Sequence, residues 1–307
     1  MALQYHAGQI EVQDEANTRP VADMLAGWVG PVGEFSSVAD LLVFATPDGD
    51  GDLRFVTVSG PAPLVEITGS TTIRIPGLAL AGNEDVMAGG LATSLAQLRR
   101  ARINGRLIPG DEGWSLETME AFTNCRKYIA PSMAIDATVR SAPVAVEPVS
   151  WDDRWLSDLI ATAETTFLAS ISPDGLPDVS HRGGQPGFIR PDASSGQLIW
   201  PEYIGDGMFK TAGNVRATGC ASLLVLDLHT GDAAELVGKA SYMTLKTRSQ
   251  ARSHGLERHR DPYPVQGEMS LSVRRARRLR GLFAPRERMA KAQRVNSCSP
   301  IDDQAPR

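Results

Sequence analysis

Apolar and polar residues alternate in short segments along much of the chain, a pattern typical of strands with one buried face. Over residues 166–171 large and small side chains alternate, and Ser-Pro-Asp-Gly at 172–175 is a turn sequence that leads into a second strand. The alternation predicts a β-hairpin here. By the same criteria, the predicted strands of this half cover residues 166–171, 176–180, 197–200, 220–228 and 233–242.

The first half of the chain repeats this pattern faintly. Ala45-Thr-Pro-Asp-Gly49 resembles Ser170-Ile-Ser-Pro-Asp-Gly175, and residues 71–75 stand in the place of 197–200. The sequence therefore predicts a duplicated barrel unit, because repeated antiparallel strands close a sheet and remove its edges. The predicted strands of this half cover residues 41–46, 53–58 and 71–75.

Helical spacing of apolar residues is confined to a few segments. Residues 21–29 and 151–163 each present one apolar face, and Gly30-Pro31 ends the first of them. A short helix is also predicted to begin within 209–214. The predicted class is mainly β (α+β), with two tandem barrel units of antiparallel strands and a few peripheral helices.

Composition limits the classes of function. The chain has 307 residues, of which 42% are hydrophobic and 22% charged, so whole-chain disorder is excluded. The formal net charge of −5 argues against a chain that binds nucleic acid or an anionic membrane by charge. The basic run at 274–280 lacks aromatic residues for base stacking, so a solvated face is the favoured interpretation.

Neither a metal site nor a membrane segment is indicated. Cys125, Cys220 and Cys298 show no metal-ligand spacing, so no zinc site or disulfide framework is predicted. Asp48-Gly-Asp-Gly-Asp52 fails as a calcium loop because Leu53 stands where the loop needs glycine. No signal-peptide pattern or long apolar run is present, and we expect a soluble cytoplasmic protein.

Chemistry-bearing residues gather between 165 and 214. His181-Arg-Gly-Gly-Gln-Pro-Gly-Phe188 combines hydrogen-bond donors with glycines that let the backbone approach a ligand. Lys210 and Thr211 stand near a predicted helix start, where backbone N–H groups favour an anion. The pattern indicates a site for a phosphate-bearing cofactor. In the first half, Ser59-Gly-Pro-Ala-Pro63 replaces these donors, so that half is predicted to be structural.

Several motifs resemble one family. Asp178-Val-Ser-His-Arg-Gly-Gly-Gln-Pro-Gly-Phe188, Trp200-Pro-Glu-Tyr203 and Gly207-Met-Phe-Lys210 resemble the flavin-binding split barrels related to pyridoxamine 5'-phosphate oxidase. Three further segments resemble a subgroup with two split-barrel halves: Tyr5-His-Ala-Gly8, Arg99-Arg-Ala-Arg-Ile-Asn-Gly105 and Phe122-Thr-Asn-Cys-Arg-Lys-Tyr-Ile129. Arg126 replaces the proline of the family's Asn-Cys-Pro-Lys-Tyr segment.

The resemblance implies two tandem split β-barrels with FMN bound mainly by the second. Its phosphate would meet Arg182, Lys210 and Thr211, and Asn214 lies in the same motif. The candidates for the ribityl chain and the ring are Ser180, His181, Gln185, Trp200 and the backbone of Gly183 and Gly184. The first half would contribute Arg100, Arg102, Asn124 and Lys127. His181 also fits a hydrogen-bonded histidine of the barrel rim without a catalytic duty.

The leading hypothesis is an FMN-dependent oxidoreductase that acts on an unidentified small molecule, with NAD(P)H or a reductase as electron donor. The chain lacks the arginine and histidine pair with which pyridoxamine 5'-phosphate oxidase itself binds the phosphate of its substrate, so a different substrate is expected. We assign no catalytic residue. The alternatives are a non-catalytic flavin carrier or sensor, and a relative that binds deazaflavin or, through His181 or His6, haem. By resemblance we expect a homodimer.

The predicted domain organisation follows from these segments. Residues 1–130 form the degenerate first half, and 131–150, rich in alanine, valine and proline, form a linker. The FMN-binding barrel covers 151–245, an extension that packs on the barrels covers 246–295, and a disordered tail covers 296–307.

Overall fold

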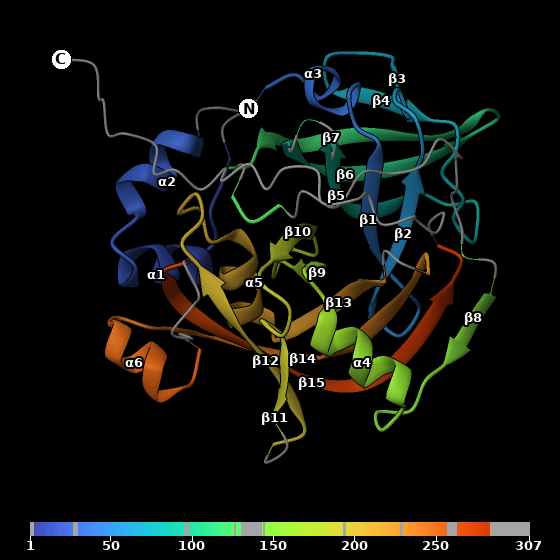
Figure 1. Ribbon diagram of the computed structural model, residues 1–307. Coiled ribbons are helices and arrows are strands. Elements are labelled where there is room, and N and C mark those ends of the chain that lie inside the picture. Colours follow the sequence, from blue (N-terminus) through green and yellow to red (C-terminus); the bar gives the residue numbers. More distant parts are fainter. Residues whose placement is uncertain are drawn as a thin grey trace.

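Figure 1 shows the computed structural model, in which antiparallel strands form two sheets accompanied by short helices. The structure describes residues 3–26, 30–94, 97, 99–125, 127–129, 143, 145–192, 195–227, 230–256 and 263–282. The predicted mainly β class with two split-barrel units of antiparallel strands is confirmed.

The first half forms a seven-stranded sheet in the order β2-β1-β5-β6-β7-β4-β3. Its strands are β1 (Leu41–Pro47), β2 (Leu53–Ser59), β3 (Glu66–Ile67), β4 (Thr72–Ile75), β5 (Val86–Ser94), β6 (Arg99–Gly110) and β7 (Gly113–Thr123). All three strands predicted for this half are present, as β1, β2 and β4.

The second half forms a sheet in the order β10-β9-β13-β14-β15-β12-β11, with β8 beside β15. Its strands are β8 (Ala145–Pro148), β9 (Thr165–Ile171), β10 (Pro177–Gly183), β11 (Arg190–Asp192), β12 (Gln197–Tyr203), β13 (Cys220–Asp227), β14 (Asp232–Thr244) and β15 (Val265–Arg280). The predicted hairpin is β9 and β10. However, β10 continues through His181 to Gly183, residues that the sequence placed in a glycine-rich turn.

The two halves have the same strand order when β9 is matched to β1, β10 to β2, and so on through β15 and β7. They also share a β-bulge at a glycine, Gly105 in β6 and Gly238 in β14. A Cβ at either glycine would come within 2.0 Å of a carbonyl oxygen on the neighbouring strand. The predicted duplication is therefore confirmed.

The helices differ between the halves. The described helices are α1 (Ala7–Glu15), α2 (Arg19–Ala26), α3 (Val32–Ser36), α4 (Arg154–Thr162), α5 (Lys210–Thr218) and α6 (Arg248–Ser253). The helix α5 connects β12 to β13, whereas residues 76–85, all described, connect β4 to β5 through turns without a helix. The predicted apolar face of 21–29 is wrong in detail, because Val21 and Met24 are exposed while Ala22 and Ala26 are buried.

Each sheet curls around an apolar core of its own. Leu168 of β9, Trp200 of β12 and Leu236 of β14 belong to one buried cluster, although their strands are not neighbours in the sheet. Phe44 and Ile75 share a cluster in the first half in the same way. Contact between such distant strands requires a curled, barrel-like sheet.

A third apolar cluster joins the two halves. On β1, Leu42 and Phe44 face their own core, whereas Val43 faces the second half. On β9, Leu168 faces its own core and Phe167 faces the first half. The strands at the interface are therefore buried on both faces, and the two units pack as one body.

Two buried ion pairs cross this interface at equivalent places. The strand registers make Arg54 of β2 equivalent to Asp178 of β10, and Arg102 of β6 equivalent to Glu235 of β14. Arg102 Nη1 lies 2.8 Å from Asp178 Oδ1, and Arg54 Nη1 lies 2.8 Å from Glu235 Oε1. The duplicated positions therefore carry the same pair with its charges reversed.

The predicted domain boundaries need two corrections. The strand β15, within the predicted extension 246–295, lies between β14 and β12 and is part of the second sheet. The strand β8, within the predicted linker 131–150, pairs with β15. The arginines of β15 interrupt the alternation of apolar and polar residues, and for this reason the sequence did not predict this strand. Residues 131–142 and the predicted tail 296–307 lie outside the described residues.

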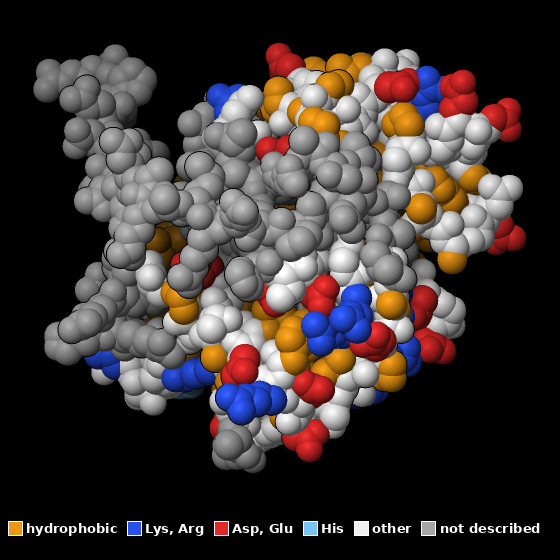
Figure 2. Space-filling view, turned by 45° about the vertical axis from the view of Figure 1, so that its right-hand side comes forward, with side chains coloured by type: hydrophobic (Ala, Val, Ile, Leu, Met, Phe, Trp, Pro, Cys, Tyr) orange, Lys and Arg blue, Asp and Glu red, His pale blue; other side chains and the backbone are white. Residues whose placement is uncertain are grey.

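The arginine run of β15 lies on a partly exposed strand, as a solvated face would, but its charges are compensated. Each of its arginines is paired with a carboxylate on a neighbouring segment. On the face shown in Figure 2, basic side chains lie beside acidic ones rather than in a separate patch. The pairs are Arg274 with Asp52, Arg275 with Asp50, Arg277 with Glu235, Arg278 with Asp232 and Arg280 with Glu147.

We predict that Gly89→Ala loosens the contact between the halves. A Cβ at Gly89 would lie 2.5 Å from the backbone nitrogen of Asp178, and backbone atoms in a sheet cannot move aside cheaply. The expected loss of unfolding free energy is about 1–3 kcal/mol. Urea denaturation measures it, with Gly49→Ala as the control because nothing lies within 4 Å of its added Cβ. Equal stability of the two variants would contradict the close contact.

Candidate functional site

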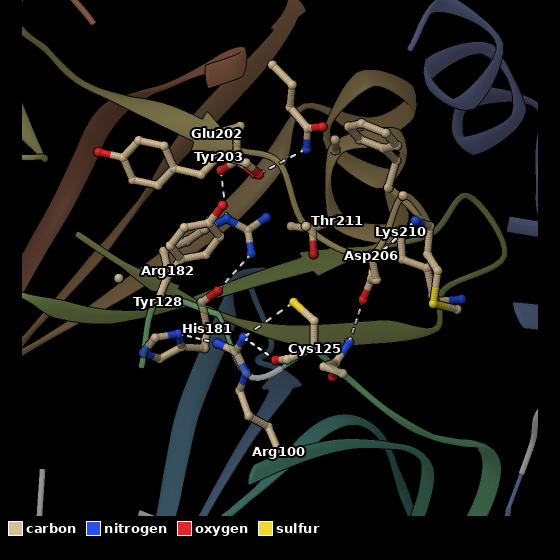
Figure 3. A pocket seen from close by; sticks show the side chains of 18 of the residues that line it. Arg100, Cys125, Tyr128, His181, Arg182, Glu202, Tyr203, Asp206, Lys210 and Thr211 are labelled. Carbon is tan, nitrogen blue, oxygen red and sulfur yellow. Dashed lines mark hydrogen bonds and ion pairs between the residues drawn. The ribbon is translucent and has the colours of Figure 1, made fainter. Parts of the chain in front are cut away.

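A pocket lies between the two halves and is lined by both (Figure 3). The first half contributes β6, the end of β7 and the turn that follows; the second contributes β10, β12 and the start of α5. The lining comprises Arg100, Arg102, Phe122, Asn124, Cys125, Tyr128, His181, Arg182, Gly183, Phe188, Pro201, Glu202, Tyr203, Gly205, Asp206, Gly207, Met208, Phe209, Lys210, Thr211, Ala212 and Gln266.

The loop from β12 to α5 shapes one wall. Gly207 has a φ of 82°, and Phe209, the residue before α5, has a φ of 50°, a left-handed conformation that is costly for a bulky residue. Helix α1 and the residue Thr18 hold this loop in place. Gln13 Nε2 donates to the Met208 carbonyl at 2.8 Å, and the Thr18 hydroxyl donates to the Gly207 carbonyl at 2.9 Å.

Asp178 is the centre of a buried polar network behind the pocket wall. Its carboxylate accepts hydrogen bonds from Arg102 at 2.8 Å, from Asn104 at 3.0 Å and from the Thr211 hydroxyl at 3.0 Å. Burial alone raises the pKa of Asp178, but the charges of Arg102 and Lys210 outweigh burial, so the pKa lies below its ordinary value. Asp178 therefore engages Thr211, one of the residues that the sequence assigned to a phosphate.

Two further cations are also paired with carboxylates of the protein. Lys210 Nζ lies 2.6 Å from Glu120 Oε1, and Arg182 Nε lies 2.6 Å from Glu202 Oε1. Glu202 also accepts from the indole N–H of Trp200 at 3.0 Å. The Lys210–Glu120 pair joins the two halves, since Glu120 lies on β7 and Lys210 begins α5, whereas Arg182 and Glu202 both belong to the second half.

Arg100 has a different environment. Its guanidinium donates to the backbone carbonyls of Cys125 at 2.7 Å and Lys127 at 2.8 Å, and to Nδ1 of His181. Figure 3 shows it reaching from β6 between His181 and Cys125. Because Nδ1 of His181 accepts this bond, the imidazole is neutral with its proton on Nε2. Burial, followed by the charges of Arg100 and Arg182, holds the pKa of His181 well below its ordinary range.

Aromatic rings stand at the pocket. Tyr128 and Tyr203 line it with ring centroids 5.2 Å apart, and Tyr263 packs edge-on against Tyr128 at 4.7 Å. Tyr128 has a φ of 65°, and its hydroxyl donates to the Ile204 carbonyl. The strained backbone at Tyr128 places its ring against the second half.

The cavity volume of the pocket is about 110 Å³. Sites for drug-sized ligands commonly measure about 300–1,000 Å³. A ligand as large as a flavin nucleotide would therefore enter only if side chains at the pocket, such as Tyr128 and Tyr203, move aside. Side-chain movements of this kind are common on binding.

The structure brings most of the predicted site residues together but not all of them. Those that line the pocket are Arg100, Arg102, Asn124, His181, Arg182, Gly183, Lys210 and Thr211. Outside the lining are Ser180, Gly184, Gln185, Trp200, Asn214 and Lys127. Trp200 is in the core, Gln185 is exposed, and Asn214 of α5 bonds with His6 and Gln9 at the start of α1.

Sequence reasoning missed the acidic side of the site. Glu120 and Asp206 carried no signal, since isolated acidic residues in a strand or loop are usually solvated. Glu202 and Tyr203 belong to the Trp200-Pro-Glu-Tyr203 motif, so the resemblance pointed at their segment without assigning them. Cys125 lines the pocket as well, and metal-ligand spacing could not have found a single cysteine.

The carboxylates Asp48, Asp50 and Asp52 lie together, with one oxygen of each within 4.8 Å of the others. Arginines of both halves surround them: Arg54 contacts Asp48 at 2.6 Å, and Arg275 contacts Asp50 at 3.2 Å. The cluster is accounted for by these ion pairs, one within the first half and one between the halves.

No family model matches the sequence, and no curated protein matches it. Among solved structures, HupZ of Group A Streptococcus is 19% identical, with 40% of this chain and 90% of HupZ covered at a TM-score of 0.31. A pyridoxamine 5'-phosphate oxidase-related, FMN-binding protein of Nostoc punctiforme is 12% identical, with 40% and 77% covered at a TM-score of 0.28.

A third similar structure is a Clostridium acetobutylicum protein of the pyridoxinephosphate oxidase family, related to general stress protein 26 of B. subtilis. It is 12% identical, with 42% of this chain and 87% of that protein covered at a TM-score of 0.27. Similarity this low assigns no family to the chain. Within the described part of the chain, every helix is too short or too polar to span a bilayer.

We predict that acidification destabilises the protein through His181. Its pKa is lowered in the folded state, so below about pH 6.5 the unfolded chain binds a proton that the folded chain does not. Unfolding free energy should therefore fall as pH drops below 6.5, by up to about 1.4 kcal/mol per pH unit from this group. The dependence continues down to the pKa of the folded state.

Urea denaturation at pH 7.5, 6.5 and 5.5 measures this dependence. His181→Gln should remove that part of the slope, whereas His254→Gln, on the surface, should keep it. An unchanged slope in the His181 variant would show that the folded protein accommodates the imidazolium.

Proposed function

We propose that the pocket between the halves binds FMN and that the protein is a flavin-dependent oxidoreductase. The observation that carries the proposal is the convergence of two segments far apart in the sequence. Members of the motifs 99–105 and 122–129 in the first half and 178–188, 200–203 and 207–210 in the second, singled out by their resemblance to flavin-binding split barrels, line the same pocket. If the basic residues at 99–105 were only a solvated surface strand, contact with the glycine-rich segment at 181–188 would not be expected.

The chemistry of the lining supports this ligand. A flavin nucleotide needs a flat, partly apolar slot for its ring and donors for its phosphate. Phe122, Tyr128 and Tyr203 supply aromatic surface, and the guanidinium of Arg100, which no carboxylate pairs with among the described residues, supplies donors. Bound FMN would supply hydride or electron transfer, and the residues of the chain would orient it and limit access of water.

Some buried polar atoms of the lining lack a partner. The orphan atoms are Arg100 Nε, Arg102 Nε, Asn124 Oδ1 and His181 Nε2. Buried polar groups nearly always have hydrogen-bond partners, so orphans gathered among the lining residues of both halves indicate that a ligand or water completes them. Because one chain supplies both walls, the proposed site needs no second chain; a homodimer stays a prediction.

We predict that the purified protein binds one FMN per chain, seen as yellow colour and as a change in flavin fluorescence on titration. Gly205 lines the pocket, and a Cβ there meets nothing within 4 Å. Gly205→Leu should therefore weaken binding by obstructing the pocket while leaving stability intact. Gly49→Leu, equally free of contacts, should bind as the unmodified protein does.

Other outcomes of the same titration separate the alternatives. A Soret band in the absorption spectrum would show that the bound cofactor is haem and not a flavin. Equal flavin binding by Gly205→Leu and Gly49→Leu would show that the ligand binds outside this pocket. With flavin bound, reduction by NAD(P)H and reoxidation by an acceptor distinguish an oxidoreductase from a carrier, which would show neither.

A further inference from the structure

We infer that the anionic group of the ligand binds at Arg100, on the wall supplied by the first half, and not at Arg182 or Lys210. This inference rests on the proposed flavin site and names the residue that would select a phosphorylated ligand. It reverses the expectation from the sequence, which placed the phosphate at the second half.

The cations of the pocket lining differ in whether a carboxylate of the protein already pairs with them. Three of the four cations are neutralised by carboxylates of the protein, at 2.8 Å for Arg102 and at 2.6 Å for both Arg182 and Lys210. Their carboxylate partners are Asp178, Glu202 and Glu120, each no more than 8% exposed. A ligand anion at one of these cations would displace a carboxylate, which would then be buried without its partner.

Arg100 is the exception among these cations. Within the described residues, no carboxylate oxygen lies within ion-pair distance of its guanidinium, which is bound by two backbone carbonyls and by neutral His181. Arg100 is only 8% exposed. The Asp206 carboxylate acts on this buried charge only from beyond ion-pair distance, so an anion that enters the pocket gains most by meeting Arg100.

The unpartnered donors point to the same wall. Arg100 Nε and Arg102 Nε are buried without a hydrogen-bond partner, and both residues lie on β6. Arginine presents several N–H groups in a plane and suits the oxygens of a phosphate. The carboxylate of Asp206, which also lines the pocket, is held by the Asn124 amide at 3.1 Å and by the Met208 N–H at 3.1 Å.

The test compares FMN with riboflavin, which lacks only the phosphate, by fluorescence titration of the full-length protein. The unmodified protein should prefer FMN. Arg100→Gln should reduce this preference about ten- to hundredfold, as expected for the loss of charge-assisted hydrogen bonds. Arg182→Gln, the control on the opposite wall, should keep the preference within about threefold, since Arg182 remains engaged by Glu202 in the bound state.

A second variant leaves Arg100 intact in case its replacement prevents folding. Glu202→Gln releases Arg182 from its carboxylate. With the phosphate at Arg100, the preference for FMN should change less than about threefold. With the phosphate at Arg182, it should rise about tenfold or more, and that rise would overturn the inference.

The remaining outcomes separate the two proposals. Equal affinity of the unmodified protein for FMN and riboflavin, or a preference lost in Arg182→Gln and kept in Arg100→Gln, would refute the role of Arg100 and leave the flavin site standing. Failure of both flavins to bind the unmodified protein would refute the proposed function itself.

Discussion

The apolar contact between the outer faces of the two sheets is the constraint on which the rest of the molecule depends. Val43 of β1, Phe167 of β9 and Leu224 of β13 all face the other half while their neighbours fill the separate cores. Full burial of one such side chain contributes about 1.5–3 kcal/mol. Exposed ion pairs contribute about 0–1 kcal/mol, so the apolar face dominates and the peripheral pairs refine the docking.

This contact also creates the pocket. It fixes β6 of the first half opposite β10 and the start of α5, so Arg102 meets Asp178 and Glu120 meets Lys210. Buried ion pairs add little net stability, because desolvation of both charges offsets their attraction. Their effect here is to define which cations of the pocket are free to meet a ligand and which are already satisfied.

Duplication produced two equivalent places, and the chain treats them differently. In the second half α5 and the donors of β10 form one side of a pocket. In the first, turns replace that helix, and the equivalent ion pair of Arg54 with Glu235 is joined by Arg277. The reversed charges allow each half to pair with the other but not with a copy of itself. One chain can therefore form a single asymmetric pocket between two unlike halves, whereas two identical units would form two equivalent sites.

The sequence by itself determined β1, β2, β4, β9, β10 and β12 to β14, the duplication and the motifs that meet in the pocket, since alternation and turn residues act locally. It did not determine β15, whose arginines hide the alternation and find their carboxylates only across the interface. Nor did it show that Lys210 and Arg182 are already paired, because Glu120 and Glu202 reach them through tertiary contacts. Residue types and spacing identify the donors available to a ligand. Only the folded chain decides which donors its own carboxylates occupy, because ion pairing depends on distances between segments far apart in the sequence.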